Sequence, residues 1–225
     1  MKRYSSVQEI FPSLRTGDIM LAHGTEWVSK AIEVVEASEW SHVCMIVLAR
    51  DIGIDTDQVL IWESSDASDL PDVITGEKKP GPMLVDAKER IATDYIEGTD
   101  SKFAIRRFVY PDFSKNYAES LKSVIDSVHA ANKGFPGTIE LTEDLVKGRF
   151  HNEPASDNNF FCSELLAYTL MELNLISKNY VPNAYTPADF QECNSSYIPW
   201  LERVLISQEI YFRKNESPAK TKRMV

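Results

Sequence analysis

The segment that decides the fold reads Asp157-Asn158-Asn159-Phe160-Phe161-Cys162-Ser163-Glu164-Leu165-Leu166-Ala167-Tyr168. Its polar start offers oxygens that can accept the free N–H groups of a first helical turn, so Asp157 to Asn159 predict the N-terminal cap of a helix. The apolar residues that follow, up to Leu173, predict that this helix is mostly buried. Cys162 therefore falls in the first turn.

A thiol in the first turn of a helix lies at the positive end of the helix dipole, beside N–H groups that have no partner within the helix. Both features favour the thiolate, which is the nucleophilic form. The same N–H groups can hold an oxyanion. Cys162 is therefore a candidate nucleophile, and the alternative is a buried structural cysteine, which is a common core residue.

The chain has 225 residues, of which 43% are hydrophobic, so it can bury the core of a sizeable domain. Its formal net charge of -10 argues against nucleic acid as the main partner, because phosphate binding needs a basic face. The three cysteines are an odd number, which argues against a disulfide framework and favours a reducing compartment.

Residues 1–14 include Lys2 and Arg3 but show no apolar core of a signal peptide. No uninterrupted apolar stretch of the sequence is long enough to span a bilayer. We therefore expect a cytoplasmic protein without a transmembrane segment. It should form one domain over residues 1–213, followed by a disordered, net-basic tail over 214–225.

Three apolar segments predict strands of one antiparallel sheet: Ile19–Ala22, Trp40–Leu48 and Val59–Glu63. The second segment is apolar on both faces, which is typical of a central strand. Side chains alternate along a strand, so His42 and Cys44 share a face. The second and third segments read as a hairpin, which would bring Glu63 level with His42.

Residues 64–100 are expected to be a lid or insertion, because Ser, Asp, Gly, Pro and Lys dominate its first half. Further helices are expected at Thr25–Ser38, Ser114–Ala131 and Glu143–Val146, and a short helical segment near Ala87–Ala92. Further strands are expected at Met83–Asp86, Lys102–Phe108 and Val204–Phe212.

A cysteine nucleophile needs a neighbouring base, and the base needs a third group that orients it. His42 heads an apolar strand, where an ionisable ring is costly without partners, so it is the candidate base. Glu63 is the candidate third group, and its alternative is simple exposure at the end of a strand. Of the other histidines, His129 is expected at the surface or in packing, His151 in solvent, and His23 beside a pocket.

Cys44 is the rival nucleophile, two residues along the strand from His42. Successive side chains on one face of a strand start about 6.6 Å apart, too far for direct proton transfer, so Cys44 is expected in the core. Cys193 falls in a loop. No His or Cys pair has the usual zinc spacing and no Gly-rich phosphate loop occurs, so neither a metal nor another cofactor is expected.

Two motifs resemble the Gly-Asp-hydrophobic and Ser-His-Val core of NlpC-like papain-fold peptidases: Thr16-Gly17-Asp18-Ile19-Met20-Leu21 and Trp40-Ser41-His42-Val43-Cys44-Met45-Ile46. In the ordinary order of that superfamily the Cys helix precedes these strands, whereas here Phe161-Cys162-Ser163-Glu164-Leu165 follows them. This order resembles the circularly permuted branch, the YiiX-like hydrolases, which are similar to lecithin:retinol acyltransferase-like proteins. The downstream Tyr185-Thr186-Pro187-Ala188-Asp189-Phe190 resembles that branch too.

The resemblance implies an α+β papain-like fold of the circularly permuted NlpC type, with a small antiparallel sheet packed against the helix that carries the catalytic cysteine. It implies that Cys162 is the nucleophile, His42 the base and Glu63 the third member, a place that many members fill with His or another polar residue. The implied reaction is hydrolysis or acyl transfer at an amide or ester. The implied substrates are lipid or fatty-acyl groups, or cell-wall-type γ-glutamyl peptides.

Aromatic residues are concentrated shortly after the Cys helix: Tyr180, Tyr185, Phe190, Tyr197 and Trp200. They can wall a pocket for an apolar chain, which favours a lipid-like substrate, or they can pack the Pro-rich segment onto the core. We expect Tyr185, Ser163 and His23 to contact the substrate. The competing class is a catalytically inactive ligand-binding module, against which the joint presence of Cys, His and Glu argues.

Overall fold

The structure is a computed structural model that describes residues 5–23, 40–67, 69–93, 102–155 and 159–213. The expected helix at Thr25–Ser38 and the expected tail over 214–225 lie outside these residues. All three cysteines are free thiols, in agreement with the absence of a disulfide framework. Within the described ranges, none of the helices combines the length and the apolar composition needed to cross a membrane.

A seven-stranded sheet forms the centre of the fold, in the order β1-β9-β6-β2-β3-β4-β5. Neighbouring strands are antiparallel, apart from β1 and β9, which run parallel. The strands are β1 (Ser5–Ser6), β2 (Ile19–His23), β3 (His42–Leu48), β4 (Val59–Ser65), β5 (Gly81–Asp86), β6 (Lys102–Arg106) and β9 (Ile210–Arg213). Strands β7 (Phe108–Tyr110) and β8 (Leu205–Ile206) form a separate antiparallel pair.

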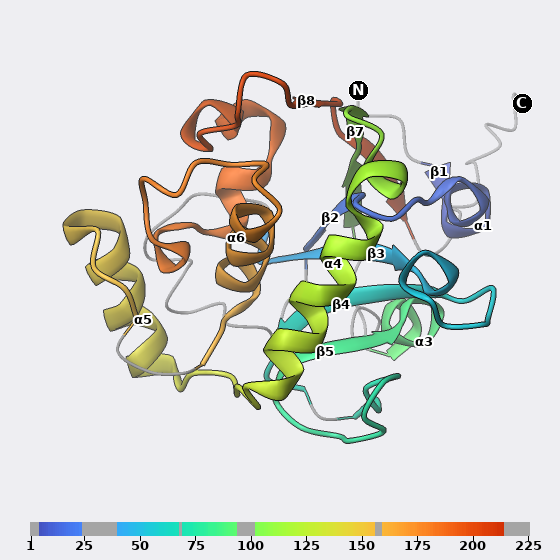
Figure 1. The fold of residues 1–225 in the computed structure, drawn as a ribbon, viewed down its shortest axis with the longest axis horizontal. Helices are drawn as coiled ribbons and strands as arrows, with labels where there is room; N and C mark the ends of the chain where they lie inside the picture. Colours follow the sequence, from blue (N-terminus) through green and yellow to red (C-terminus); the bar gives the residue numbers. More distant parts are fainter. Residues whose placement is uncertain (1–4, 24–39, 68, 94–101, 156–158, 214–225) are drawn as a thin grey trace, which may run out of the picture.

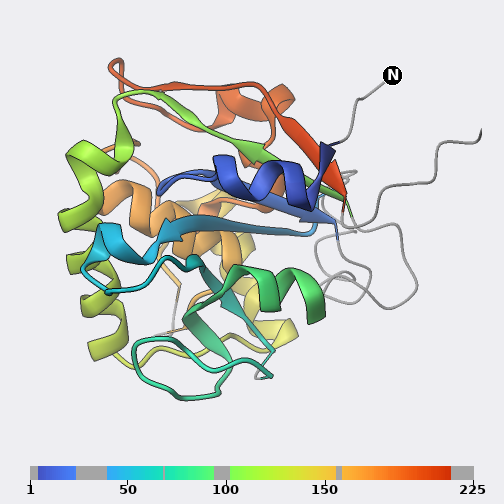
Figure 2. The ribbon, with the colours of Figure 1, turned by 90° about the vertical axis from the view of Figure 1, so that its right-hand side faces the viewer.

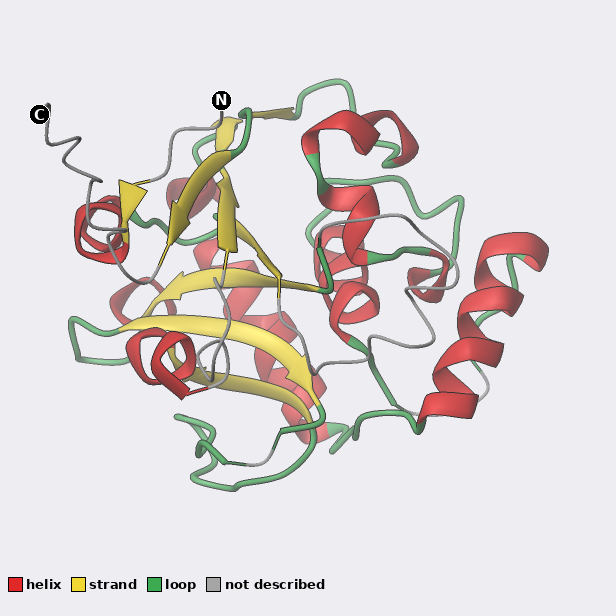
Figure 3. Ribbon diagram, turned by 180° about the vertical axis from the view of Figure 1, so that it is seen from behind, coloured by secondary structure: helices red, strands yellow, loops and turns green. Residues whose placement is uncertain are grey.

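Helices cover both faces of the sheet. The α-helices are α1 (Val7–Ile10), α3 (Ala87–Thr93), α4 (Phe113–Ala130), α5 (Thr138–Val146) and α6 (Cys162–Glu172). Shorter helical turns are η1 (Phe11–Ser13), η2 (Ala49–Ile52), η3 (Lys147–His151), η4 (Pro182–Ala184), η5 (Pro187–Phe190) and η6 (Glu192–Tyr197). Helix α4 lies in front of the strands in Figure 1 and α3 lies in front of them in the reverse view, so the two helices pack on opposite faces (Figures 1 and 3).

Side-chain alternation along the strands separates the core into two layers. On β3, Val43, Met45 and Val47 pack with residues of α4 and α6, such as Ile125 and Leu166. The side chains between them, including Cys44 and Ile46, pack on the other face with Ile10 of α1 and Ile91 of α3. Figure 2 shows the strands running between these helices. Both faces of β3 are therefore buried, as its apolar sequence predicted.

The α+β class is confirmed, but the sheet is larger than expected and contains one parallel pair. The predicted strands at Ile19–Ala22, Trp40–Leu48, Val59–Glu63, Met83–Asp86 and Lys102–Phe108 correspond to β2, β3, β4, β5 and β6. The predicted strand at Val204–Phe212 is wrong as one element, because β8 and β9 belong to different sheets.

The expected lid over residues 64–100 contains parts of the main fold. Strand β5 pairs with β4 from Leu60–Asp86 to Ser65–Gly81, and α3 follows it directly. Arg90 of α3 is fully buried. Residues 81–93 thus build one edge of the sheet and the helix that covers it, and residues 94–100 lie outside the described chain.

Candidate active site

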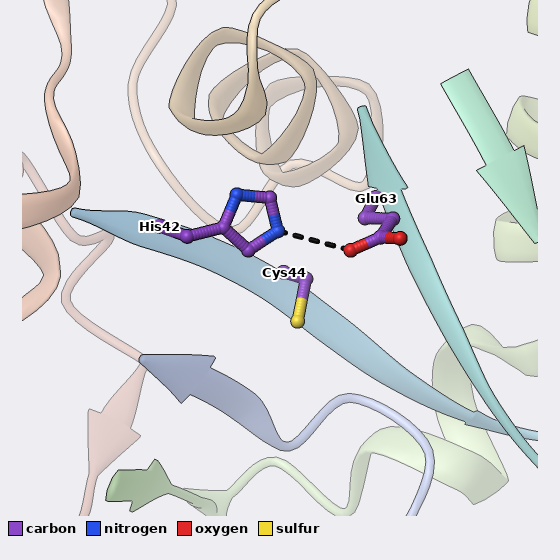
Figure 4. Close-up of side chains that lie close together, drawn as sticks. All are labelled: His42, Cys44 and Glu63. Carbon is purple, nitrogen blue, oxygen red and sulfur yellow. Dashed lines mark hydrogen bonds and ion pairs between the residues drawn. The ribbon is translucent and has the colours of Figure 1, made fainter. Parts of the chain in front are cut away.

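The candidate site lies where β3 and β4 part. Their antiparallel ladder runs from Leu48–Val59 to Met45–Trp62, and beyond that pair the two strands diverge (Figure 4). His42 stands on β3 and Glu63 on β4, and their side chains meet across the opening. His42 Nε2 lies 3.0 Å from Glu63 Oε2, with side chains only 8% and 1% exposed. The two residues that the hairpin argument predicted to be level are thus in hydrogen-bond contact.

Arg90 holds the other oxygen of Glu63. Its Nε donates to Glu63 Oε1 at 2.5 Å, and its Nη1 donates to Asp69 Oδ1 at 3.0 Å. Burial is the largest influence on the Glu63 carboxyl and works to raise its pKa, but Arg90 and His42 together outweigh it and hold the pKa below its usual value. Glu63 is therefore a buried carboxylate that has one oxygen fixed by a cation and one oxygen facing the imidazole.

Cys44 belongs to the same cluster. The ligand-type atoms of His42, Cys44 and Glu63 all lie within 4.8 Å of one another (Figure 4). Cys44 is also a core residue, as expected, at 1% exposure. Burial raises the pKa of its thiol to about 11, an interaction with His42 opposes this, and charge on Glu63 and Cys162 adds to it. Cys44 is therefore a poor nucleophile near neutral pH.

Cys44 lies closer to His42 than the sequence spacing predicts. The predicted separation of about 6.6 Å is that of the side chains at the backbone, whereas the ligand-type atoms at their ends are within 4.8 Å of each other, because side chains lean along a strand. Sequence spacing does not reveal the cluster as a set of metal ligands, because its third member, Glu63, comes from another strand. The cluster is compatible with a metal ion in ligand type and in spacing.

Cys162 is the first residue of α6 and is 3% exposed. The start of α6 is tied to the opening between the strands, because Ser64 Oγ on β4 donates to the carbonyl of Phe160 at 2.5 Å. Within the described part of the chain, no hydrogen bond joins the Cys162 thiol to the His42 ring.

The predicted cap of α6 is wrong for Asn159. The N-cap residue is Phe161, whose N–H donates to Glu164 Oε2 at 3.4 Å. The Asn159 side chain instead accepts from the N–H of Gly134 and donates to Glu140. Asp157 and Asn158 lie outside the described residues. Cys162 is still in the first turn of the helix, as predicted, and the N–H groups of that turn have no acceptor within the helix.

The three residues expected to contact substrate lie in different settings. Ser163 is fully buried, and its Oγ donates to the carbonyl of Tyr185 at 2.8 Å. Tyr185 is 3% exposed, and burial raises the pKa of its phenol to about 12. His23 ends β2 opposite Lys102 of β6 and is half-buried. Ser163 and Tyr185 thus adjoin the first turn of α6.

A pocket of about 420 Å³ lies on the Tyr185 side of α6, lined by Arg149, Tyr180, Ala184, Tyr185, Tyr197 and Pro199. Three of the five aromatic residues that the sequence singled out are in this lining. Phe190 is fully buried and packs against Tyr185 in the core, with ring centres 6.3 Å apart. Trp200 stacks edge-on against Phe108, so these two aromatic residues follow the packing alternative.

Arg149 was not predicted as part of the site. It comes from η3, and its two terminal nitrogens donate to the two oxygens of Asp189 at 2.7 and 3.1 Å. Its guanidinium carbon also lies 5.7 Å from the centre of the Tyr197 ring. Arg90 was missed as well. Neither arginine lies in a sequence motif. Each differs from a surface arginine only in its contact with a carboxylate, and the fold creates that contact.

No family model matches this sequence, and no curated protein matches it. Among solved structures, the chain superposes on the crystal structure of metalloprotein yiiX from Escherichia coli O157:H7 with a TM-score of 0.46 and 16% sequence identity. The superposition covers 87% of this chain and 97% of that chain.

Proposed function

We propose that the protein is a cysteine-dependent hydrolase or acyltransferase that acts on an amide or ester bond. Cys162 is the nucleophile, His42 is the base and Glu63 orients the His42 ring. The observation that carries this proposal is the buried His42–Glu63 hydrogen bond of 3.0 Å at the opening where the first turn of α6 is tied down. This chemistry is that of the permuted NlpC-like papain-fold hydrolases which the sequence resembles.

In the proposed reaction the Cys162 thiol passes its proton to His42 as its sulfur attacks the carbonyl carbon of the substrate. The tetrahedral intermediate collapses when protonated His42 gives that proton to the leaving amine or alcohol, and a thioester remains on Cys162. Water, or an acceptor amine or alcohol, then loses a proton to His42 and attacks the thioester. The acyl product leaves and the thiol is restored.

Glu63 and the start of α6 stabilise the charges that develop. A carboxylate fixed by Arg90 keeps the His42 ring in one orientation and stabilises it when it is protonated. The N–H groups of the first turn of α6, including that of Cys162, are available for the oxyanion. The thiol must move into hydrogen-bond contact with His42 for the first step, and such contacts often tighten only when substrate binds.

The pocket beside Tyr185 supports a lipid-like or fatty-acyl substrate. Rings of Tyr180, Tyr185 and Tyr197 line it, and aromatic walls suit an apolar chain. The Ser163–Tyr185 hydrogen bond joins this wall to the turn that carries Cys162. An acyl chain in the pocket would therefore place its carbonyl near the thiol.

One observation favours a second substrate class. Arg149 also lines the pocket, and an arginine recognises the carboxylate of a γ-glutamyl peptide well. Its charge is already matched by the two-point contact with Asp189, however, and this contact weakens its pull on a further anion. We therefore put the acyl substrate first and the peptide amidase second.

The test is a side-by-side assay of fatty-acyl esters and amides against short γ-glutamyl peptides, with Cys162→Ala as the blank and Cys193→Ser as a matched control for an exposed thiol. We expect turnover of the acyl substrates that Cys162→Ala abolishes and Cys193→Ser retains. Turnover of peptides alone would replace the acyl substrate and keep the thiol mechanism. Turnover that survives Cys162→Ala, or binding of either substrate without turnover, would remove the mechanism and favour a ligand-binding module.

A further inference from the structure

We propose that His42, Cys44 and Glu63 form a binding site for a zinc ion. The three residues supply a ring nitrogen, a thiolate sulfur and a carboxylate oxygen, which are the donors that zinc prefers. Their ligand-type atoms lie within 4.8 Å of one another, with the His42 ring and the Glu63 carboxylate in contact and the Cys44 thiol beside them (Figure 4). Buried groups of this composition differ from the exposed acidic clusters that occur without a metal.

The geometry requires only small movements of these side chains. Donors that share a tetrahedral zinc ion at bond lengths of about 2.0 to 2.3 Å lie about 3.3 to 3.5 Å apart. His42 Nε2 and Glu63 Oε2 are already 3.0 Å apart. Cys44 Sγ makes a long contact of 3.8 Å with the carbonyl of Met20, which is weak enough to give up.

The surroundings of Glu63 resemble the outer shell of a metal site. Arg90 holds Oε1 and leaves Oε2 directed at the cluster, so the carboxylate is oriented before an ion arrives. The charges also balance. Zinc carries two positive charges, which the Cys44 thiolate and the Glu63 carboxylate neutralise, and Arg90 is neutralised by Asp69 at 3.0 Å.

Binding converts the Cys44 thiol into a zinc thiolate and releases one proton to solvent. Three protein ligands leave the fourth position of a tetrahedral ion open to water or to an added ligand. This arrangement differs from a closed structural site with four protein ligands. Folding of the chain should therefore not depend on the ion.

One consequence rests on the proposed function. In the hydrolase, His42 Nε2–H donates to Glu63 and the lone pair that accepts the proton of Cys162 is on Nδ1. Zinc bound to Nε2 would leave the ring proton on Nδ1, so His42 could no longer accept the proton of Cys162. Zinc occupancy and thiol chemistry would exclude each other, and the ion would inhibit the hydrolase. Zinc binding itself does not depend on that activity.

The experiment titrates metal-free, full-length protein with Co²⁺, which reports a bound thiolate through a charge-transfer absorption band, and then displaces it with Zn²⁺. We expect one ion per chain and a thiolate band in the wild type. Cys44→Ser should lose the band and weaken zinc binding by about 10-fold or more. Cys162→Ser and Cys193→Ser should keep both.

The matched serine variants decide which thiol binds. A band that persists in Cys44→Ser and disappears in Cys162→Ser would overturn the site, and so would the absence of stoichiometric binding in the folded wild type. His42→Ala is a second variant, which should weaken binding while Cys44 remains in place. Circular dichroism checks that each variant is folded. Failure of the proposed function would appear in the substrate assay and would leave these titrations unchanged.

Discussion

His42 and Glu63 form one buried histidine–carboxylate pair, with 3.0 Å between the two groups, and His129 and Asp72 form another, at 2.9 Å. The side-chain exposures are the same in both pairs, 8% for each histidine and 1% for each carboxylate. Distance and burial therefore do not distinguish a catalytic candidate from a structural contact. The other partners of each carboxylate do.

Both carboxylate oxygens of Asp72 accept hydrogen bonds from the backbone. Besides His129, its oxygens accept from the N–H groups of Ile74, Thr75 and Leu84. Burial would raise the pKa of Asp72, but the hydrogen bonds to His129 and to these N–H groups lower it to about 2. The pair fixes the turn before β5 against α4, where the ring of Trp62 also meets His129 edge-on. We therefore interpret this pair as a structural contact that holds the turn on the helix.

Glu63 has side-chain partners instead: Arg90 on one oxygen and His42 on the other. Its pair borders a diverging strand opening, the Cys44 thiol and the start of α6. A carboxylate held by side chains at such a place can exchange partners, whereas one held by three backbone N–H groups cannot. Under the proposed function, this difference favours a catalytic role for the first pair and a structural role for the second.

The largest expected effect tests this assignment directly. Glu63→Gln should lose activity on the order of 10²-fold or more, because the amide cannot stabilise protonated His42. It should also lower the free energy of unfolding by about 1–3 kcal/mol, because Arg90 keeps Asp69 but loses the charge of a buried hydrogen-bond partner. Asp72→Asn should lose about 1–3 kcal/mol of stability and keep its turnover within a few-fold. Denaturant unfolding and the substrate assay measure both.

Equal losses of turnover in folded Glu63→Gln and Asp72→Asn would break the comparison. To separate orientation from folding, the assay includes Glu63→Asp, which keeps the charge beside Arg90 but shortens the reach toward His42. We expect this variant to recover stability more fully than activity. Full activity in Glu63→Asp would argue that the charge alone, and not the position of the oxygen, supports His42.

The sequence could predict the first pair and not the second, for a physical reason. His42 and Glu63 lie on consecutive strands whose alternation and hairpin order specify a shared face. His129 and Asp72 are 57 positions apart, on a helix and a turn, so only the packing of α4 on the sheet brings them together. We expect His129 at the surface or in packing from the sequence, and the packing alternative holds, with a hydrogen bond to Asp72 in addition.

Long-range packing also explains the other omissions. Arg90 follows a segment whose composition predicts an exposed lid, and nothing local indicates that its guanidinium is fully buried. The parallel pairing of β1 with β9 joins two ends of the chain through two residue pairs, which is too short for a periodic signal. By contrast, long apolar segments such as β3 and α6 were placed correctly because their periodicity is itself determined by burial.

A third buried carboxyl, that of Glu164, extends the comparison to a group on which burial outweighs the opposing influences. Burial raises the pKa of the Glu164 carboxyl to about 8. The hydrogen bond that this carboxyl accepts from the N–H of Phe161 lowers the pKa, but by less than burial raises it. Between about pH 4.5 and 8 the unfolded chain loses this proton and the folded chain keeps it, so stability should fall as pH rises through that window. Glu164→Gln should remove this fall.

Thermal unfolding at pH 5 and pH 8 measures the effect of Glu164→Gln. The drop in melting temperature from pH 5 to pH 8 should be smaller in the variant than in the wild type. Glu172→Gln, which removes an exposed carboxyl from the same helix, serves as the control. If the drop in melting temperature is the same in Glu164→Gln as in the wild type, Glu164 ionises normally in the folded protein. Burial would then not distinguish this carboxyl from Glu63 and Asp72.

The structural pair should show the opposite pH response. Because the pKa of Asp72 is lowered from 3.8 to about 2, its stabilising contribution is complete above about pH 4 and is lost as pH falls toward 2. The lowered pKa corresponds to a contribution of about 2 kcal/mol from ionised Asp72 to the free energy of unfolding. Asp72→Asn should therefore unfold less steeply with acid than the wild type. Circular dichroism followed during acid titration measures this. Identical acid unfolding curves for the wild type and Asp72→Asn would contradict the structural role of the pair.

The smallest expected effects compare the two serines that hold the first turn of α6. Ser64 joins the carbonyl of Phe160 to β4, and Ser163 joins the helix to the carbonyl of Tyr185. Each Ser→Ala change should cost about 1 kcal/mol of stability, because one buried hydrogen bond is lost.

If the opening between the strands performs chemistry and the pocket beside Tyr185 binds substrate, the kinetic effects of the two changes should differ. Ser64→Ala should lower kcat a few-fold with little change in KM, and Ser163→Ala should raise KM with little change in kcat. The reverse pattern would move substrate binding to the strand opening and leave the aromatic pocket without a role.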